Sequence, residues 1–134
     1  MSRLRSVPAY VPGHGLLAGK HAIVTAAAGA GIGFSTAMKI AEEGAAGLLI
    51  SDIHEERLEK ARATIERETG VPVFAQRCDV SRADEVAALV EAAREHLPRV
   101  DVLVNNAGFG AAKALLDMTD EDWDRVQDIT LKST

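Results

Sequence analysis

The stretch HAIVTAAAGAGIGFSTAMKIAEEG, residues 21–44, decides the fold of this chain. It begins with a short apolar run, residues 21–25, whose partly β-branched side chains are typical of a buried strand. A glycine-rich turn follows, and apolar side chains then recur at helical spacing from Phe34 to Ala41. Gly44 is well placed to end that helix. A buried strand, a glycine turn and a helix, in this order, predict the first unit of an α/β fold.

The same alternation repeats along the chain. Residues 46–51 (AGLLIS) and 100–104 (VDVLV) are apolar enough to be buried strands. Residues 71–77 (VPVFAQR) predict another strand, in which Pro72 is tolerable only at the start or on a sheet edge. Apolar positions within residues 58–65 give the inner face of a helix. We therefore expect four strands, with the third at the rim of the sheet.

Two later helices carry start signals. Residues 81–84 (SRAD) and 119–122 (TDED) both have the spacing of a capping box. Met118 and Trp123 flank the second of these signals at the positions of a hydrophobic staple. Both segments are therefore predicted to start helices.

This order of elements predicts a Rossmann-type, doubly wound parallel sheet of the α/β class, with strand order 3-2-1-4. Such sheets normally continue, so we expect one truncated after the fourth strand and part of the following helix. The fourth strand would then lie at an open edge. Residues 1–19, rich in proline and glycine, are expected to form an N-terminal tail, and residues 20–134 a partial Rossmann domain.

Composition excludes several classes of protein. The chain has 134 residues and a formal net charge of −5, which argues against a nucleic-acid partner. Its one cysteine, Cys78, excludes an intrachain disulfide and a cysteine-cluster metal site, and the four histidines lack metal-ligand spacing. No apolar run approaches the roughly eighteen residues of a membrane span, and prolines and glycines after Arg3 and Arg5 argue against a secretory signal. We expect a cytoplasmic protein with no metal site and no membrane contact.

The turn TAAAGAGIG, residues 25–33, suits phosphate groups. Its glycines permit close backbone approach, and the free N–H groups that open a helix attract an anionic pyrophosphate. The spacing departs from G-x-G-x-x-G, because Phe34 or Thr36 occupies the place of the third glycine. A tight turn without a ligand therefore remains an alternative.

Asp52 ends the second predicted strand, where an acidic side chain can accept hydrogen bonds from the adenosine ribose of a dinucleotide. A 2′-phosphate would be repelled there, and the neighbouring alanines and Ile53 supply no cation, so NAD is favoured over NADP. Capping of the next helix, over Glu55, is the alternative role and is compatible with the first.

Two further segments, residues 78–80 (CDV) and 105–108 (NNAG), directly follow predicted strands. Because the carboxyl ends of parallel strands meet at one edge, we expect both segments beside the glycine turn and Asp52. Their combination predicts a dinucleotide site, although NNAG alone is only a polar turn.

With these features in order from Lys20 onward, together with WDRV at residues 123–126, the chain resembles the N-terminal, cofactor-binding half of the short-chain dehydrogenase/reductase family. The resemblance implies that residues 31–33 approach the pyrophosphate, that Asp52 holds the adenosine ribose, and that residues 79–80 flank the adenine. The cofactor-binding residues expected from the turn and the resemblance are Thr25, Gly29, Gly31, Ile32, Gly33, Asp52, Asp79, Val80, Asn105, Ala107 and Gly108.

The glycine turn departs from the family pattern. Ala26 stands where the family has a glycine after the threonine, and one extra residue precedes Gly31, so Gly29 is expected to supply the missing flexibility. This longer turn, with the lead-in GHGLL at residues 13–17, resembles a bacterial subgroup that degrades steroid or other acyl-CoA intermediates.

No catalytic residue is assigned in this chain. The family uses a serine, a tyrosine and a lysine spaced Y-x-x-x-K, and an asparagine at the position where Thr130 stands here. The only tyrosine, Tyr10, has His14 four residues later rather than a lysine, and the chain ends at Thr134 before the family's catalytic positions.

The resemblance implies an NAD(P)-dependent oxidoreductase acting on an alcohol or ketone, with NAD as the cofactor and an acyl-CoA or steroid-derived substrate as a narrower expectation. Residues 20–134 would be its partial NAD(P)-binding domain, and the full-length form would be a homo-oligomer. A catalytically silent NAD-binding module and an inactive fragment are the alternatives.

Overall fold

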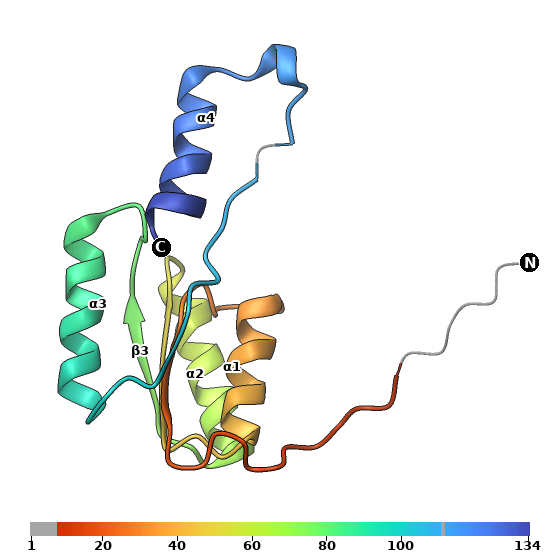
Figure 1. Ribbon diagram of the computed structural model, residues 1–134, viewed down its shortest axis with the longest axis vertical. Helices are drawn as coiled ribbons and strands as arrows, with labels where there is room; N and C mark the ends of the chain where they lie inside the picture. The colour runs from red at the N-terminus through yellow and green to blue at the C-terminus, as the bar shows by residue number, and fades with distance from the viewer. Residues whose placement is uncertain (1–7, 111) are drawn as a thin grey trace, which may run out of the picture.

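The computed structural model describes residues 8–110 and 112–134, in which strands and helices alternate as the sequence predicts (Figure 1). In chain order the elements are β1 (His21–Val24), α1 (Ile32–Glu42), β2 (Gly47–Asp52), α2 (Glu55–Thr69), β3 (Val73–Arg77), α3 (Ala83–His96), β4 (Val102–Val104), the 3₁₀ turn η1 (Leu115–Asp117), α4 (Asp120–Gln127) and the π-helical turn η2 (Asp128–Lys132).

The four strands form one parallel sheet in the order β3-β2-β1-β4, which confirms the expected topology. In its register, Ile23 of β1 lies between Leu49 of β2 and Leu103 of β4. Pro72 directly precedes the edge strand β3, and its carbonyl accepts a hydrogen bond from the backbone N–H of Leu48 at 3.1 Å. The proline therefore lies at the tolerated position, and all four carboxyl ends point to the same edge.

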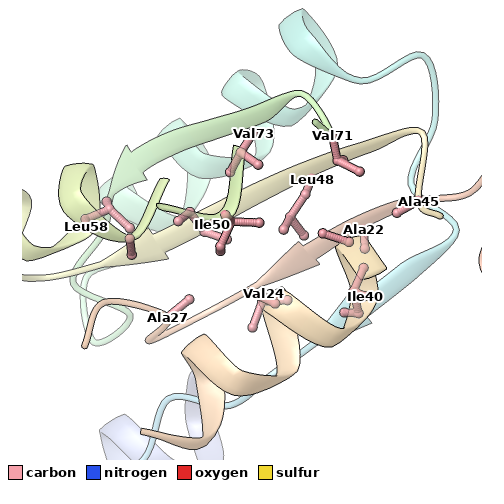
Figure 2. Close-up of a cluster of buried hydrophobic side chains, with 14 residues drawn as sticks. Ala22, Val24, Ala27, Ile40, Ala45, Leu48, Ile50, Leu58, Val71 and Val73 are labelled. Carbon is pink, nitrogen blue, oxygen red and sulfur yellow. The ribbon is translucent and has the colours of Figure 1, made fainter. Parts of the chain in front are cut away.

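Helices cover both faces of this sheet. On one face, α1 and α2 pack over side chains of β1 and β2, and the cluster in Figure 2 joins Val24, Leu48 and Ile50 to Ile40 and Leu58. On the other face, α3 packs through a second cluster. Every residue of β2 is buried, because this strand has neighbours on both sides and helices above and below. The turns that follow the strands therefore extend from a closely packed sheet.

The two capping signals have different outcomes. The box at the start of α4 is confirmed, because the side chains of Thr119 and Asp122 each accept a hydrogen bond from the other's backbone N–H. The box expected at residues 81–84 is wrong: α3 begins after Arg82, which makes no side-chain cap. The Ser81 hydroxyl instead donates to Asp79 at 2.7 Å, and the N-cap position falls one residue later, at Arg82.

Two predictions at the end of the sheet concern exposed apolar side chains. Leu103 of the edge strand β4 is 56% exposed, in agreement with an open edge. Trp123 of α4 is 57% exposed, so the expected staple with Met118 buries little of the indole.

Within residues 8–19, contacts from residues 10–16 reach the C-terminal end of α1 rather than the carboxyl edge of the sheet (Figure 1). The Glu43 carboxylate accepts hydrogen bonds from the backbone N–H groups of His14 and Leu16 at 2.7 and 3.1 Å. Lys39 donates to the carbonyl of Val11 at 2.7 Å. Arg3 and Arg5 lie outside the described residues. Within the described ranges, no helix has the length and apolar character needed to cross a membrane.

Candidate functional site

The turns after all four strands border one pocket of about 470 Å³ at the carboxyl edge of the sheet. Arg125 of α4 and Ile129 of η2 complete its wall. The lining residues are Ala26, Asp52, Ile53, His54, Cys78, Asp79, Val80, Ala107, Gly108, Phe109, Arg125 and Ile129. The parallel topology thus brings together segments that are far apart in the sequence.

The N-terminus of α1 opens beside this edge with its backbone donors uncapped. Gly31 is the N-cap residue and has no side chain that could cap the helix. The first turn of α1 has no acidic residue. A Cβ built on Gly31 would meet no atom within 4 Å, and Ile32 is 79% exposed. Free N–H groups in open space at a helix N-terminus can bind an anion.

Two residues of the glycine turn have positive φ. Gly29, at φ 126°, has a conformation that side chains rarely adopt, in agreement with the flexibility expected of it. Ala26 has φ 52°, at the position where the family resemblance has a glycine. The chain therefore retains a left-handed conformation at this position with an alanine, at a cost of about 1–2 kcal/mol.

Gly33 performs a packing role beneath the turn. A Cβ at this position would lie 2.2 Å from the carbonyl oxygen of Ala26 and 2.5 Å from Nδ2 of Asn106. Only glycine allows α1 to approach the turn this closely. Its expected approach to a pyrophosphate remains a prediction, whereas Gly31 faces open space.

The Asp52 carboxylate joins the glycine turn to the end of β2. Its Oδ2 accepts a hydrogen bond from the backbone N–H of Ala28, and its Oδ1 accepts one from that of His54, both at 3.0 Å. The N-cap residue of α2 is His54, and it has no side-chain cap, so the alternative of an Asp52 cap over Glu55 is wrong. Asp52 is 8% exposed and lines the pocket. A carboxylate has about four acceptor positions, so two remain for a ligand.

Thr25 and Asn106 lie behind the pocket wall and connect two turns. The Thr25 hydroxyl oxygen accepts hydrogen bonds from the backbone N–H groups of Asn106 and Ala107 at 3.0 and 3.1 Å. The Asn106 amide donates to the carbonyls of Thr25 and Ala26, both at 3.1 Å. Sequence reasoning selected Asn105, which is exposed and does not line the pocket, whereas Asn106 holds the turn.

Asp79 and Val80 line the pocket after β3. Hydrogen bonds from the hydroxyl and backbone N–H of Ser81 lower the pKa of the Asp79 carboxyl. Burial is the main cause of the raised pKa of the neighbouring Cys78 thiol. Cys78 is 3% exposed, and a buried thiol with a raised pKa is unreactive.

The turn after β4 is held from the other side by the last helical segment. Thr130 Oγ1 accepts from the backbone N–H of Phe109 and donates to its carbonyl, both at 3.1 Å. The Arg125 guanidinium lies 4.5 Å from the centroid of the Phe109 ring. Tyr10, by contrast, hydrogen-bonds Glu42 at the end of α1 and contributes nothing to the pocket.

The structure brings five of the expected residues into the pocket wall: Asp52, Asp79, Val80, Ala107 and Gly108. Gly29, Gly31 and Ile32 lie at the exposed opening of α1, whereas Thr25 and Gly33 are buried behind it. The sequence reasoning did not select the other lining residues, which are Ala26, Ile53, His54, Cys78, Phe109, Arg125 and Ile129. The i, i+4 spacing of the last two could have indicated a shared helix face. Within the described residues, no three His, Cys, Asp or Glu side chains gather as metal ligands would.

Comparison with known proteins identifies this arrangement. Residues 20–134 match the family model described as short chain dehydrogenase. The chain belongs to the short chain dehydrogenase family. This membership agrees with the parallel sheet, the glycine turn and the NNAG segment at the same edge.

Two relatives of this short chain dehydrogenase come from mycobacteria. The (5R,7aS)-5-hydroxy-7a-methyl-1-oxo-2,3,5,6,7,7a-hexahydro-1H-indene-carboxyl-CoA reductase of Mycobacterium tuberculosis is 45% identical over 130 residues, which are 97% of this chain and 49% of the relative. A short chain dehydrogenase from Mycobacterium smegmatis has a crystal structure with a TM-score of 0.90 and 48% identity, covering 94% of this chain and 52% of that one. The chain therefore spans about half the length of the relatives it matches.

Two further structures of this fold were solved with a dinucleotide. The NAD⁺-bound xylitol dehydrogenase has a TM-score of 0.80 and 36% identity, covering 88% of this chain and 45% of that one. The L-sorbose reductase from Gluconobacter frateurii, complexed with NADPH and L-sorbose, has a TM-score of 0.81 and 31% identity, covering 87% and 44%. Relatives with the same fold thus bind either form of the nicotinamide dinucleotide.

Proposed function

We propose that this chain forms the NAD-binding half of an oxidoreductase that interconverts an alcohol and a ketone. One observation carries the proposal: the turns after four parallel strands line a single pocket with Asp52 in its wall, at the edge where α1 presents its uncapped N-terminus. A nicotinamide dinucleotide, when bound, supplies the hydride acceptor or donor. The residues of this chain bind and orient it.

The residues present fit such a cofactor. The uncapped N–H groups after Gly31 match the charge of a pyrophosphate, and the empty space at Gly31 allows it to approach the backbone. Asp79 and Val80, which also line the pocket, would flank the adenine. Ala107 and Gly108 would contact the cofactor beyond the glycine turn.

Asp52 supports a preference for NAD over NADP. Its carboxylate is held by two backbone donors and keeps acceptor capacity for the two hydroxyls of an adenosine ribose. A 2′-phosphate in the same place would bring like charges together. Among the pocket-lining residues, the one Lys or Arg is Arg125, and its guanidinium lies over the Phe109 ring.

The substrate class is inferred from the relatives and the turn. The Mycobacterium tuberculosis relative is named as the reductase of a hydroxy- and oxo-substituted indene-carboxyl-CoA, and it aligns over 97% of this chain. The longer glycine turn, with its glycine-rich lead-in at residues 13–17, points to the same subgroup. We therefore propose an acyl-CoA or steroid-derived ketone, and a homo-oligomer for the full-length form.

Calorimetric titration of the 134-residue chain with NAD and with NADP tests the cofactor assignment, and light scattering on the same sample reports its assembly state. We expect saturable NAD binding and weaker NADP binding. Asp52→Asn should weaken NAD binding by about 1–3 kcal/mol through lost hydrogen bonds to the ribose, and should narrow the difference between the two cofactors.

Asp101→Asn is the matched control. Asp101 accepts a backbone hydrogen bond from His21 at 2.9 Å, as Asp52 does from His54, but it precedes β4 at the opposite edge of the sheet. Its replacement should leave both affinities unchanged. A folded chain that binds neither dinucleotide would contradict the proposal, and equal losses in the two variants would refute the role of Asp52.

A further inference from the structure

Arg125 of α4 lines the pocket, and its guanidinium contacts an aromatic ring. Its guanidinium carbon lies 4.5 Å from the ring centroid of Phe109, within the range of a cation–π contact. Phe109 directly follows Ala107 and Gly108, and all three line the pocket. The contact therefore joins α4 to the turn that would touch the cofactor.

The Phe109 backbone is already fixed by a separate contact. Thr130 Oγ1 accepts from its N–H and donates to its carbonyl, both at 3.1 Å. These bonds hold the main chain but leave the ring free to rotate about its side-chain torsions. Phe109 is 37% exposed, so packing alone does not fix the ring. The Arg125 guanidinium lies against the ring itself, so it can favour one ring position.

Arg125 lies over the Phe109 ring although several carboxylates are nearby. A hollow beside the pocket is lined by Asp79, Glu121, Asp124 and Asp128 as well as by Arg125. Among the ion pairs of residues 8–110 and 112–134, however, none includes Arg125, and Asp122 on the same helix pairs with Lys113. The guanidinium thus contacts the Phe109 ring rather than forming an ion pair with one of these carboxylates.

We propose that Arg125 is a positioning residue for the cofactor, which acts by holding the Phe109 ring as a fixed part of the pocket wall. The inference rests on the proposed function, because it assigns Arg125 a role in the same dinucleotide site. It requires no direct contact between Arg125 and the cofactor. The loss of the guanidinium should therefore matter only while the ring is present.

A double-mutant cycle on the 134-residue chain tests this dependence. The NAD dissociation constant is measured by calorimetry for the wild-type chain, Arg125→Met, Phe109→Leu and the double variant. We expect each single variant to weaken binding about three- to fivefold, the size of an exposed cation–π contact, and the double variant to be no weaker than either. Arg125→Lys keeps a cation for the ring and should restore most of the affinity.

Two further measurements separate positioning from a general loss of structure. Arg94→Met, an exposed arginine on α3 paired with Glu91, is the matched control and should bind NAD as the wild type does. The midpoint of thermal unfolding should be the same for Arg125→Met and Arg94→Met. The aromatic ¹H resonances of Phe109 should shift in Arg125→Met without NAD, because the ring loses its fixed position.

The outcomes distinguish this inference from the proposed function. If the wild-type chain binds NAD and Arg125→Met binds equally well, the positioning role is wrong and the proposed function stands. Additive losses in the double variant would also overturn it, because they would indicate that Arg125 contacts the ligand directly. If the wild-type chain binds no NAD, the proposed function and the positioning role both fail.

Discussion

Asn106 and Thr25 hold each other through two hydrogen bonds that connect the ends of β1 and β4. The Asn106 backbone N–H donates to Thr25 Oγ1 at 3.0 Å, and its side-chain amide donates to the Thr25 carbonyl at 3.1 Å. The same amide also reaches the carbonyl of Ala26 at 3.1 Å. One side chain thus satisfies two carbonyls of the glycine turn, so the turn depends on a residue from a distant segment.

Asn106→Ala should lower the free energy of unfolding by about 1–3 kcal/mol, because two turn carbonyls lose their donors. Urea denaturation followed by circular dichroism measures the change. Asn105→Ala is the control: this neighbour is exposed, and its replacement should stay within about 0.5 kcal/mol of the wild type. Equal effects of the two variants would show that the Asn106 bonds contribute nothing to the fold.

Ala26→Gly should stabilise the chain by about 0.5–1 kcal/mol. Ala26 has φ 52°, a conformation that costs an L-residue about 1–2 kcal/mol, and glycine removes this cost while adding entropy to the unfolded chain. Ala28→Gly, at a neighbouring position without positive φ, should destabilise by about 0.5–1 kcal/mol. Thermal unfolding of both variants measures the two changes in stability, which should have opposite signs. A loss of stability in Ala26→Gly would show that the backbone of Ala26 is not strained.

The sequence predicted those features that depend on local patterns. The apolar runs and the helical periodicity after residue 33 correctly predicted β1, α1 and the parallel order of the strands. Asp52 was correctly placed at the end of β2. These predictions succeed because burial of a strand or helix face requires a regular spacing of apolar side chains.

The features that sequence reasoning missed depend on competition between partners. Ser81 has the spacing to cap α3, but the helix takes Arg82 as its N-cap while the Ser81 hydroxyl donates to Asp79, and spacing alone cannot fix the residue at which the helix begins. Asn105 and Asn106 are both plausible site residues in the sequence, and only the backbone direction after β4 decides which one points at Thr25. The contact of Arg125 with Phe109 depends on how α4 returns to the sheet, which no local pattern encodes.

Alanine substitutions at Gly31 and Gly33 should distinguish an effect on NAD binding from an effect on stability. A Cβ at Gly33 would lie 2.2 Å from the carbonyl oxygen of Ala26, so Gly33→Ala should destabilise the chain by about 1–3 kcal/mol through overpacking. Gly31→Ala meets open space at φ −92° and should leave the stability unchanged within about 1 kcal/mol.

Gly31→Ala, which should leave the stability unchanged, should nevertheless weaken NAD binding. Its added methyl group would occupy the space through which a pyrophosphate approaches the N-terminus of α1, so NAD affinity should fall although the fold is intact. The unfolding midpoint and the dissociation constant are measured on the same preparations. A Gly31→Ala chain with normal NAD affinity would place the pyrophosphate elsewhere.

The last prediction concerns the attachment of residues 8–19 to the end of α1. The Glu43 carboxylate accepts hydrogen bonds from the backbone N–H groups of His14 and Leu16, and these bonds lower the pKa of its carboxyl below the usual 4.5. A group with a lowered folded-state pKa stabilises the fold fully above the unfolded value, and this contribution is lost as the pH falls through the folded value. The attachment should therefore be intact at neutral pH and weaken below about pH 4.5.

Glu43→Gln removes the charge and should reduce the protection factors of the His14 and Leu16 amides in hydrogen exchange at pH 7, because a neutral amide oxygen is a weaker acceptor than a carboxylate. In the wild-type chain the protection factors should fall toward those of the variant as the pH drops to 3. Glu95→Gln, at an exposed position on α3, is the matched control and should change neither value. If wild-type protection at pH 3 equals that at pH 7, the charge of Glu43 does not hold this segment. NAD affinity should be the same in both variants, because Glu43 follows the C-terminal end of α1 while the proposed cofactor site lies at its N-terminal end.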